Sequence, residues 1–124
     1  MSSAKRPYDS SRVAGKATAR FVRVSARKAR VMLDQLRFKT VAEAEVILKF
    51  TPKPSVVPII SRVLATAKAS VNRHDFPNVE ELVIGDIRAD VGPMMKRVRP
   101  QSRGRAAWIR RRSCHISLSL MPPA

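Results

Sequence analysis

Hydrophobic positions follow a helical spacing in the first half of the chain and a strand spacing in the second. Ala29, Met32, Leu33 and Leu36 recur at i, i+3, i+4 and i+7. This spacing predicts an amphipathic helix with one narrow buried stripe. Ser25 lies just before the stripe and can cap the helix, so the helix is expected to begin there.

Two further helices are predicted before the spacing changes. Thr40 and Glu43 form a capping-box pattern, and the helix that starts there ends before Pro52. A third helix begins near Ser55, with Pro58 tolerated in its first turn. Six apolar residues keep helical spacing along it over four turns: Val56, Ile60, Val63, Leu64, Ala67 and Val71.

Three segments have the character of β-strands. Residues 18–24 are β-branched and aromatic with interleaved arginines, which predicts a strand with a basic face. Apolar side chains then alternate with polar ones in two later segments. The alternating positions are Val83, Gly85, Ile87, Ala89 and Val91, followed by Cys114, Ile116, Leu118 and Leu120. The pattern predicts an α+β fold, with three helices packed on a small antiparallel sheet of three strands and a long protruding β-hairpin.

The predicted organisation is one domain with short tails. Residues 1–16 are expected to form a flexible basic N-terminal tail, which could become ordered on RNA. Residues 17–120 form a single α+β domain that includes an extended hairpin over 82–120. Residues 121–124 form a C-terminal tail, because two prolines there cannot extend a central strand.

Charge distribution separates the chain into a neutral middle and two basic flanks. The net charge is +16, of which residues 1–30 and residues 93–112 carry +8 each, while residues 31–92 sum to zero. We call residues 93–112 the arm. Its eight cations, with no acid among them, are Lys96, Arg97, Arg99, Arg103, Arg105, Arg110, Arg111 and Arg112.

The arm forms the outer half of the predicted hairpin. About 18 residues from Leu82 to the turn would span on the order of 60 Å at roughly 3.3 Å per residue. A compact chain of this length has a radius of gyration near 14 Å, so the hairpin must protrude. A two-stranded ribbon of this kind is marginal in water and cannot bury its own charges, and we expect a polyanion beside it to order it.

The charge of the arm also fits two other interpretations. Charge runs are usually solvated, and Arg110–Arg112 could form a nuclear import signal, although an import signal needs no flanking strands. Arginine dominates the arm, and its planar fork suits bidentate phosphate contacts. Trp108 could stack on a base or pack on a neighbouring protein.

Further RNA-binding candidates lie outside the arm. Cations in the first turn of a helix oppose its dipole unless an anion lies nearby, which favours phosphate contacts at the start of the first helix. The candidates are Arg20, Arg23, Arg27, Lys28, Arg30 and His115.

The sequence offers little for catalysis. His74, His115 and Cys114 cannot build a structural zinc site, and we expect no metal, no cofactor and no catalytic residue. Cys114 and His115 are adjacent in a strand pattern, so their side chains point to opposite faces and cannot form a nucleophile–base pair. Cys114 is expected to be a small core residue.

Four motifs in unbroken order resemble the bacterial type of the large-subunit ribosomal protein twenty-two family. Ser25–Arg30 (SARKAR) resembles the family's S-P-R-K-A/V-R helix start. Gly92–Arg97 resembles its G-P-x-x-K-R hairpin entry. Arg103–Ala106 resembles its K/R-G-R-A, and Ser113–Ile116 resembles its T-S-H-I. The resemblance covers about residues 17–120, with Phe38 standing where the family often has glycine.

The resemblance implies a structural constituent of the large ribosomal subunit that is not an enzyme. It implies a body near the exit of the polypeptide tunnel and a hairpin that runs inward through large-subunit ribosomal RNA and supports its folding and assembly. The hairpin tip would line the tunnel wall beside the nascent polypeptide, across from the loop of ribosomal protein four. The implied tip residues are Arg99, Pro100, Gln101, Ser102, Arg103, Gly104 and Arg105.

The expected partners follow from this resemblance. They are large-subunit ribosomal RNA, neighbouring large-subunit ribosomal proteins and the nascent polypeptide, with no homo-oligomer and no membrane span. A cytoplasmic ribosome is expected, with an organellar one as the open alternative. The competing hypothesis is an architectural DNA-binding protein whose β-arm enters the minor groove with Pro100 as a wedge; such a protein would need to dimerise.

Overall fold

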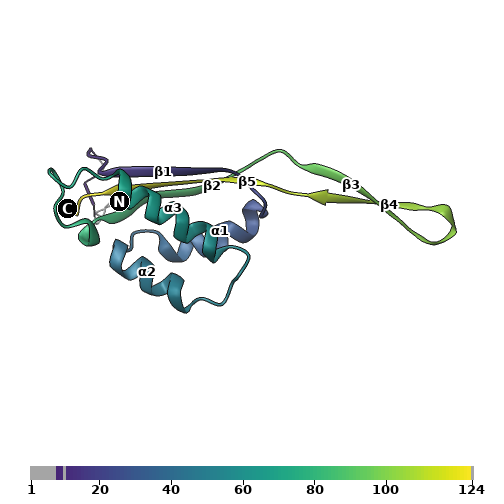
Figure 1. Cartoon of the computed structure of the whole chain (residues 1–124), viewed down its shortest axis with the longest axis horizontal. Helices are drawn as coiled ribbons and strands as arrows, with labels where there is room; N and C mark the ends of the chain where they lie inside the picture. The colour runs from purple at the N-terminus through teal and green to yellow at the C-terminus, as the bar shows by residue number, and fades with distance from the viewer. Residues whose placement is uncertain (1–7, 10, 124) are drawn as a thin grey trace, which may run out of the picture.

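The α+β fold class is confirmed in a computed structural model, which describes residues 8, 9 and 11–123. The helices and strands are β1 (Gly15–Val22), α1 (Ala26–Leu36), α2 (Val41–Phe50), α3 (Val57–Ser70), β2 (Val83–Val91), β3 (Met95–Pro100), β4 (Ala106–Arg111) and β5 (Cys114–Met121). β1, β5 and β2 form an antiparallel sheet in that order, and β3 pairs with β4 in a separate two-stranded sheet. Figure 1 shows the second sheet extending away from the first.

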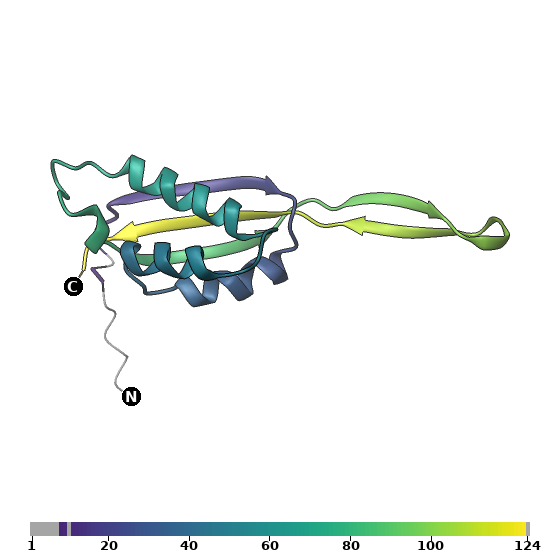
Figure 2. The same cartoon turned by 60° about the horizontal axis from the view of Figure 1, so that its bottom comes forward.

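The helices cover one face of the three-stranded sheet (Figure 2). α3 packs along β1 and α1 packs along β2, while α2 contacts α3 and the short turn Val79–Glu81. We call this unit, which is the described chain outside the arm, the body. Within the described residues, no helix is both long enough and apolar enough to cross a membrane.

The predicted helix starts are confirmed at two positions. The Ser25 hydroxyl accepts a hydrogen bond from the backbone N–H of Lys28 at the start of α1. Thr40 and Glu43 make both hydrogen bonds of a capping box at the start of α2. Each cap satisfies backbone N–H groups that the helix itself leaves without a partner, which is why the helices begin there.

β5 is the central strand and supplies the middle of the core. Cys114, Ile116, Leu118 and Leu120 are all at most 1 % exposed, as the alternation predicted. Their side chains belong to the same cluster as the buried stripes of α1 and α3. Burying one such aliphatic side chain contributes about 1.5–3 kcal/mol, so this strand anchors the body.

The predicted alternation of β2 is wrong at its start. The register against β5 shifts between Ile84 and Asp86, which makes a bulge at Gly85. After this shift Ile84 lies in the main core, while Val83 packs in a separate small cluster with Tyr8 and Met121. A bulge of one residue reverses which face each earlier side chain occupies, and strict alternation cannot anticipate it.

The ends of the domain differ from the predicted tails. The predicted flexible tail over 1–16 falls in part on residues 1–7 and 10, which lie outside the described residues. The described part joins the fold: Tyr8 forms a β-bridge with Pro123, and the Ala14 N–H donates to Leu120 O at 2.8 Å.

β1 begins at Gly15, three residues earlier than expected, and β5 continues through Met121. These pairings use backbone groups and a small residue, so side-chain pattern gives no sign of them. A Cβ on Gly15 would lie 2.7 Å from the Ala67 carbonyl oxygen of α3, and only glycine allows β1 to approach the helix this closely.

Candidate nucleic-acid interface

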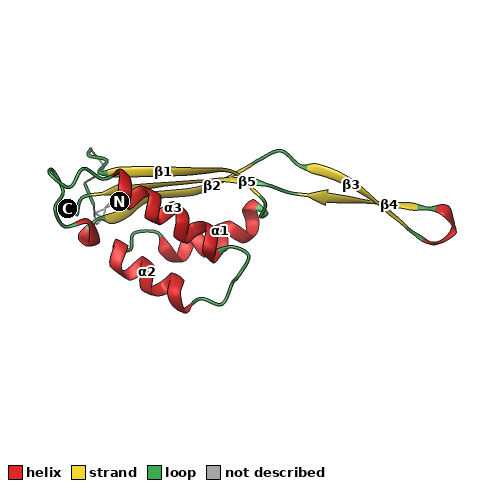
Figure 3. Ribbon diagram, in the orientation of Figure 1, coloured by secondary structure: helices red, strands yellow, loops and turns green. Residues whose placement is uncertain are grey.

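The arm is a two-stranded antiparallel ribbon with a short tip (Figure 3). Its register runs from Met95 opposite Arg111 to Pro100 opposite Ala106. Every residue of β3 is exposed, and so are all eight cations of the arm. None of the arm's residues belongs to the hydrophobic core. The arm therefore offers its charges to solvent along its whole length.

Like charges face each other across the arm. Lys96 lies directly opposite Arg110 in the register, and opposed like charges destabilise a strand pair. The described residues form ion pairs only in the body, so no carboxylate offsets the arm's cations. Anionic groups placed between these side chains would remove the repulsion, and this favours a polyanion along the ribbon.

A compact turn over residues 101–105 closes the tip. The Gln101 N–H donates to Arg105 O at 2.6 Å, and both Arg103 and Gly104 have left-handed backbone conformations, with φ of 62° and 69°. Glycine adopts this conformation without strain, whereas Arg103 does not. The turn and the end of β3 together present three exposed arginines, Arg99, Arg103 and Arg105, within seven residues.

Apolar side chains are also exposed on the arm. Val98 lies opposite Trp108 in the register, and the two are 56 % and 70 % exposed. They share one face of the ribbon, because directly opposed residues point the same way. Trp108 is thus accessible to a stacked base or to a protein neighbour, the two alternatives that its sequence position indicated.

The junction between body and arm is held by hydrogen bonds. The Gly92 N–H donates to Ser113 O at 2.9 Å, and the Ser113 hydroxyl donates to Pro93 O at 2.5 Å. Because β2 leads into the arm and β5 leads out of it, these bonds join the two strands where the pairing changes. The arm's direction is set here by the sheet of the body.

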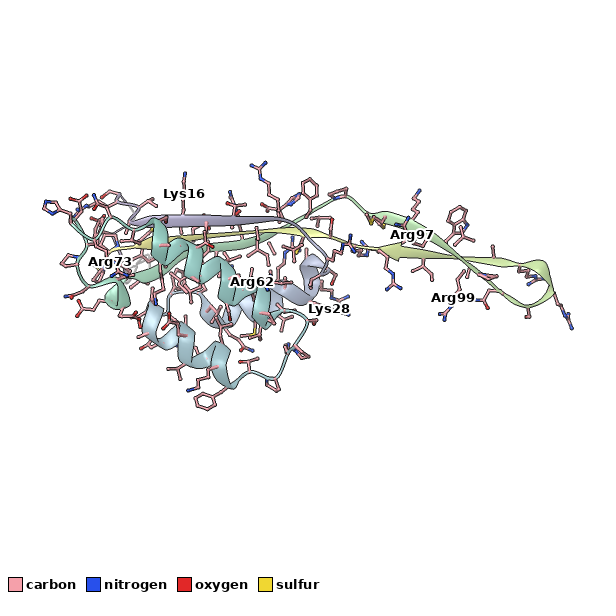
Figure 4. All side chains as sticks on the ribbon, viewed as in Figure 1. Lys16, Lys28, Arg62, Arg73, Arg97 and Arg99 are labelled. Atoms are coloured by element: carbon pink, nitrogen blue, oxygen red, sulfur yellow. The ribbon has the colours of Figure 1, made fainter. Side chains whose placement is uncertain are left out.

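All five of the predicted body cations are exposed: Arg20, Arg23, Arg27, Lys28 and Arg30. Arg20 lies near the end of β1, where the pairing with β5 is irregular, and Arg23 follows the strand. Arg27 and Lys28 lie in the first turn of α1. Lys28 lies at the end of the body from which the arm extends (Figure 4). The fold thus brings the basic start of α1 close to the arm, although they are far apart in the sequence.

Arg30 has a structural contact that the sequence did not reveal. Its Nε donates to Ala89 O at 3.1 Å, and Arg37 Nη2 donates in the same way to Ile87 O at 2.9 Å. Both carbonyls lie on β2, an edge strand of the sheet. The two guanidinium groups donate to backbone carbonyl oxygens of this edge strand, which could otherwise pair with another strand. Arg30 therefore stabilises the fold, whatever else its terminal nitrogens bind.

His115 is half-buried and makes a specific intramolecular contact. Its Nδ1 accepts a hydrogen bond from the backbone N–H of Phe21 at 3.0 Å. The two rings also meet edge to face, with centroids 5.0 Å apart. One ring nitrogen of this predicted RNA-binding residue is therefore already occupied, and only Nε2 remains to donate outward.

Cys114 is a core residue, as predicted. Its side chain is fully buried, and burial raises the pKa of the thiol, with the nearby Arg30 opposing the shift. A raised pKa favours the neutral thiol, which is not the nucleophilic form. The Cys114 thiol is thus protected from reagents in two ways: it is inaccessible to solvent, and its neutral form is favoured.

We expect the Cys114 thiol to react with a disulfide reagent such as DTNB at pH 8 only as fast as the protein unfolds. In denaturant it should react at once. A matched control is Ser113→Cys in a Cys114→Ser background, which places a thiol on the neighbouring half-buried position. Rapid stoichiometric labelling of native Cys114 would show that the strand is not packed as described.

A packed body that carries an exposed cationic arm is typical of proteins that bind a polyanion. Comparison with known proteins gives the family. Residues 17–121 match the model of the family described as ribosomal protein L22p/L17e. The chain belongs to this family, and it is therefore a ribosomal protein of the large subunit and not an enzyme.

Curated relatives agree with this assignment. The chain is 42 % identical over 107 residues to the large ribosomal subunit protein uL22 of a Synechococcus species, covering 86 % of this chain and 91 % of the relative. It is 47 % identical over 103 residues to uL22 of Clostridioides difficile, covering 83 % and 92 %. Staphylococcus aureus uL22 is 44 % identical over 103 residues, covering 83 % and 87 %. The resemblance found in the sequence motifs is confirmed.

Proposed function

We propose that the chain binds large-subunit ribosomal RNA, supports its folding and assembly, and lines the nascent-polypeptide exit tunnel with its tip. The observation that carries this proposal is the arm. Its eight exposed cations have no carboxylate partner among the described residues, and its strands place Lys96 directly opposite Arg110. RNA phosphates supply the missing negative charge.

The two parts of the molecule contribute differently. The body is a packed unit whose exposed cations near the arm, such as Arg27 and Lys28, would contact backbone phosphates and set its orientation. The arm would thread between RNA segments, where its arginine forks bind phosphates from both faces of the ribbon. A narrow ribbon fits this role because it adds contact length with little protein volume.

The tip would lie at the edge of the RNA and face the nascent chain. Residues 101–105 form the turn, and its arginines are exposed on a closed loop without apolar cover. A tunnel wall must not bind passing hydrophobic segments tightly, and a polar, cationic turn meets this requirement. Neighbouring ribosomal proteins would contact the body, and a cytoplasmic ribosome is the proposed location.

The test is co-migration with the large subunit in a sucrose gradient, combined with site-specific crosslinking. A photoreactive residue at Arg103 should crosslink to large-subunit ribosomal RNA and to a stalled nascent chain. A photoreactive residue at Glu81, in the turn before β2, should give neither crosslink because it lies on the body away from the arm. Migration only with free protein, or binding to duplex DNA as an obligate dimer, would favour the architectural DNA-binding hypothesis.

A further inference from the structure

Phe21 has a backbone conformation that its side chain disfavours. Its φ is 56°, in the left-handed region. A bulky non-glycine residue there is an outlier, and such outliers persist where the surroundings or the function require them. The strain therefore calls for a compensating role at this position.

The strain arises at a bulge that turns Phe21 outward. β1 pairs with β5 through Ala19 opposite Ile116 and Val22 opposite Cys114, so two residues of β1 oppose the single residue His115. Bulges of this type redirect a side chain and are frequent beside functional sites. Here the Phe21 side chain is 64 % exposed, although burial is the usual reason to keep a phenylalanine.

His115 fixes the exposed ring. Its Nδ1 accepts the Phe21 N–H at 3.0 Å, and its ring meets the Phe21 ring edge to face at 88°. As an acceptor at Nδ1, the imidazole is neutral and carries its proton on Nε2. A fixed aromatic face and a nearby N–H donor thus lie together on the sheet face that the helices leave uncovered.

Charges around this pair differ between its two sides. Arg20 and Arg23 flank Phe21 in sequence and are exposed. On the other side, Asp90 lies opposite His115 in the register and is 3.7 Å from Arg88, which offsets its charge. The net positive charge therefore lies on the β1 side, while the β2 side is locally neutral, so an incoming nucleic-acid strand would follow β1.

We propose that Phe21 is a stacking platform for one unpaired nucleobase of the bound RNA, and that His115 positions it. The exposed ring takes the base, Arg20 and Arg23 take the flanking phosphates, and the His115 Nε2–H can donate to the base or ribose. Aromatic residues stack on bases of any sequence, because every base has a π face. This site rests on the proposed RNA-binding function and specifies one contact within it.

The decisive variant is Phe21→Gly. Glycine accepts the left-handed backbone without strain, so the melting temperature should be equal or higher. Affinity for transcribed large-subunit ribosomal RNA should nevertheless fall roughly 5- to 150-fold, the range expected for loss of one stacked base. Phe21→Tyr should retain near wild-type affinity and Phe21→Leu should not, because only tyrosine keeps an aromatic face.

Phe38 provides a matched control. It is also a phenylalanine with positive φ, 65°, and is 48 % exposed. Its ring stacks on Tyr8, and its N–H donates to Ile84 O at the start of β2, the end of the body away from the arm. Phe38→Gly relieves the same backbone strain far from the proposed site, so it should leave RNA affinity unchanged.

The outcomes separate this proposal from the proposed function. If excess heparin, a non-specific polyanion, removes all binding of the wild-type protein to ribosomal RNA, the RNA-binding function itself fails. If wild-type protein binds and Phe21→Gly and Phe21→Leu bind equally well, only the stacking site is refuted. An equal loss of RNA affinity in Phe38→Gly would refute the stacking site too. It would also be refuted if Phe21→Gly bound RNA normally but failed to enter the large subunit, because that result points to a protein neighbour.

Discussion

Replacing residues 94–112 with a short Gly-Ser turn should abolish tight binding to ribosomal RNA while leaving the body folded. The arm carries eight cations and contributes no residue to the core. If each cation neutralises one phosphate, its loss should reduce the slope of log affinity against log salt concentration by roughly 0.7–0.9 per contact, or about 6–7 in all. Affinity measured at several salt concentrations gives the slope directly.

A charge-neutral arm distinguishes charge from shape in this experiment. Replacing all eight cations by glutamine keeps the ribbon's length and its exposed apolar pair, Val98 and Trp108. This variant should lose most of the same slope, and its melting temperature should match that of the wild-type protein. Retained salt dependence in either variant would show that the body, and not the arm, provides the main electrostatic contacts.

Leu118→Ala should have the largest effect on stability. Leu118 is 1 % exposed on the central strand, among the core residues of the body. Removing a buried leucine side chain costs about 2–5 kcal/mol, since the surrounding helices only partly fill the cavity. For a chain of this size that lowers the melting temperature by roughly 8–20 °C, which calorimetry can measure.

Val98→Ala is the matched control for this core change. Val98 is an aliphatic residue in a strand too, but it lies on the arm and is 56 % exposed. Its replacement should change the free energy of unfolding by less than about 0.5 kcal/mol. Equal destabilisation by both changes would mean that the arm and the body unfold as one unit, contrary to the separation described here.

Sequence pattern predicted the elements whose side chains make the core. The stripe of α1 and the alternation of β5 are both buried as expected, because packing against a single core imposes those periods. The caps at Ser25 and Thr40 are local and were equally predictable. The exposure of the arm was predictable from its eight cations, because arginine and lysine without an acidic partner are almost never buried.

Features made by backbone geometry could not be predicted in this way. The bulge at Gly85 and the bulge at Phe21 each shift a strand register by one residue. A glycine inside a strand pattern is a signal for the first bulge that alternation alone does not use, whereas the second has no side-chain signature in this chain. The contact of Arg30 with the edge of β2 depends on tertiary placement. Arg30 and His115 were selected for their residue types, and the structure gives both an additional role inside the protein.

The most direct test of the central claim is amide hydrogen exchange of the arm, measured in free protein and in protein bound to large-subunit ribosomal RNA. We expect the paired amides of β3 and β4 to exchange rapidly in the free protein, because an isolated two-stranded ribbon is marginal. On binding, these amides should become protected, while those of β5 are protected in both states. Slow exchange of the arm in free protein, or no added protection on RNA, would contradict a cationic arm that RNA holds in place.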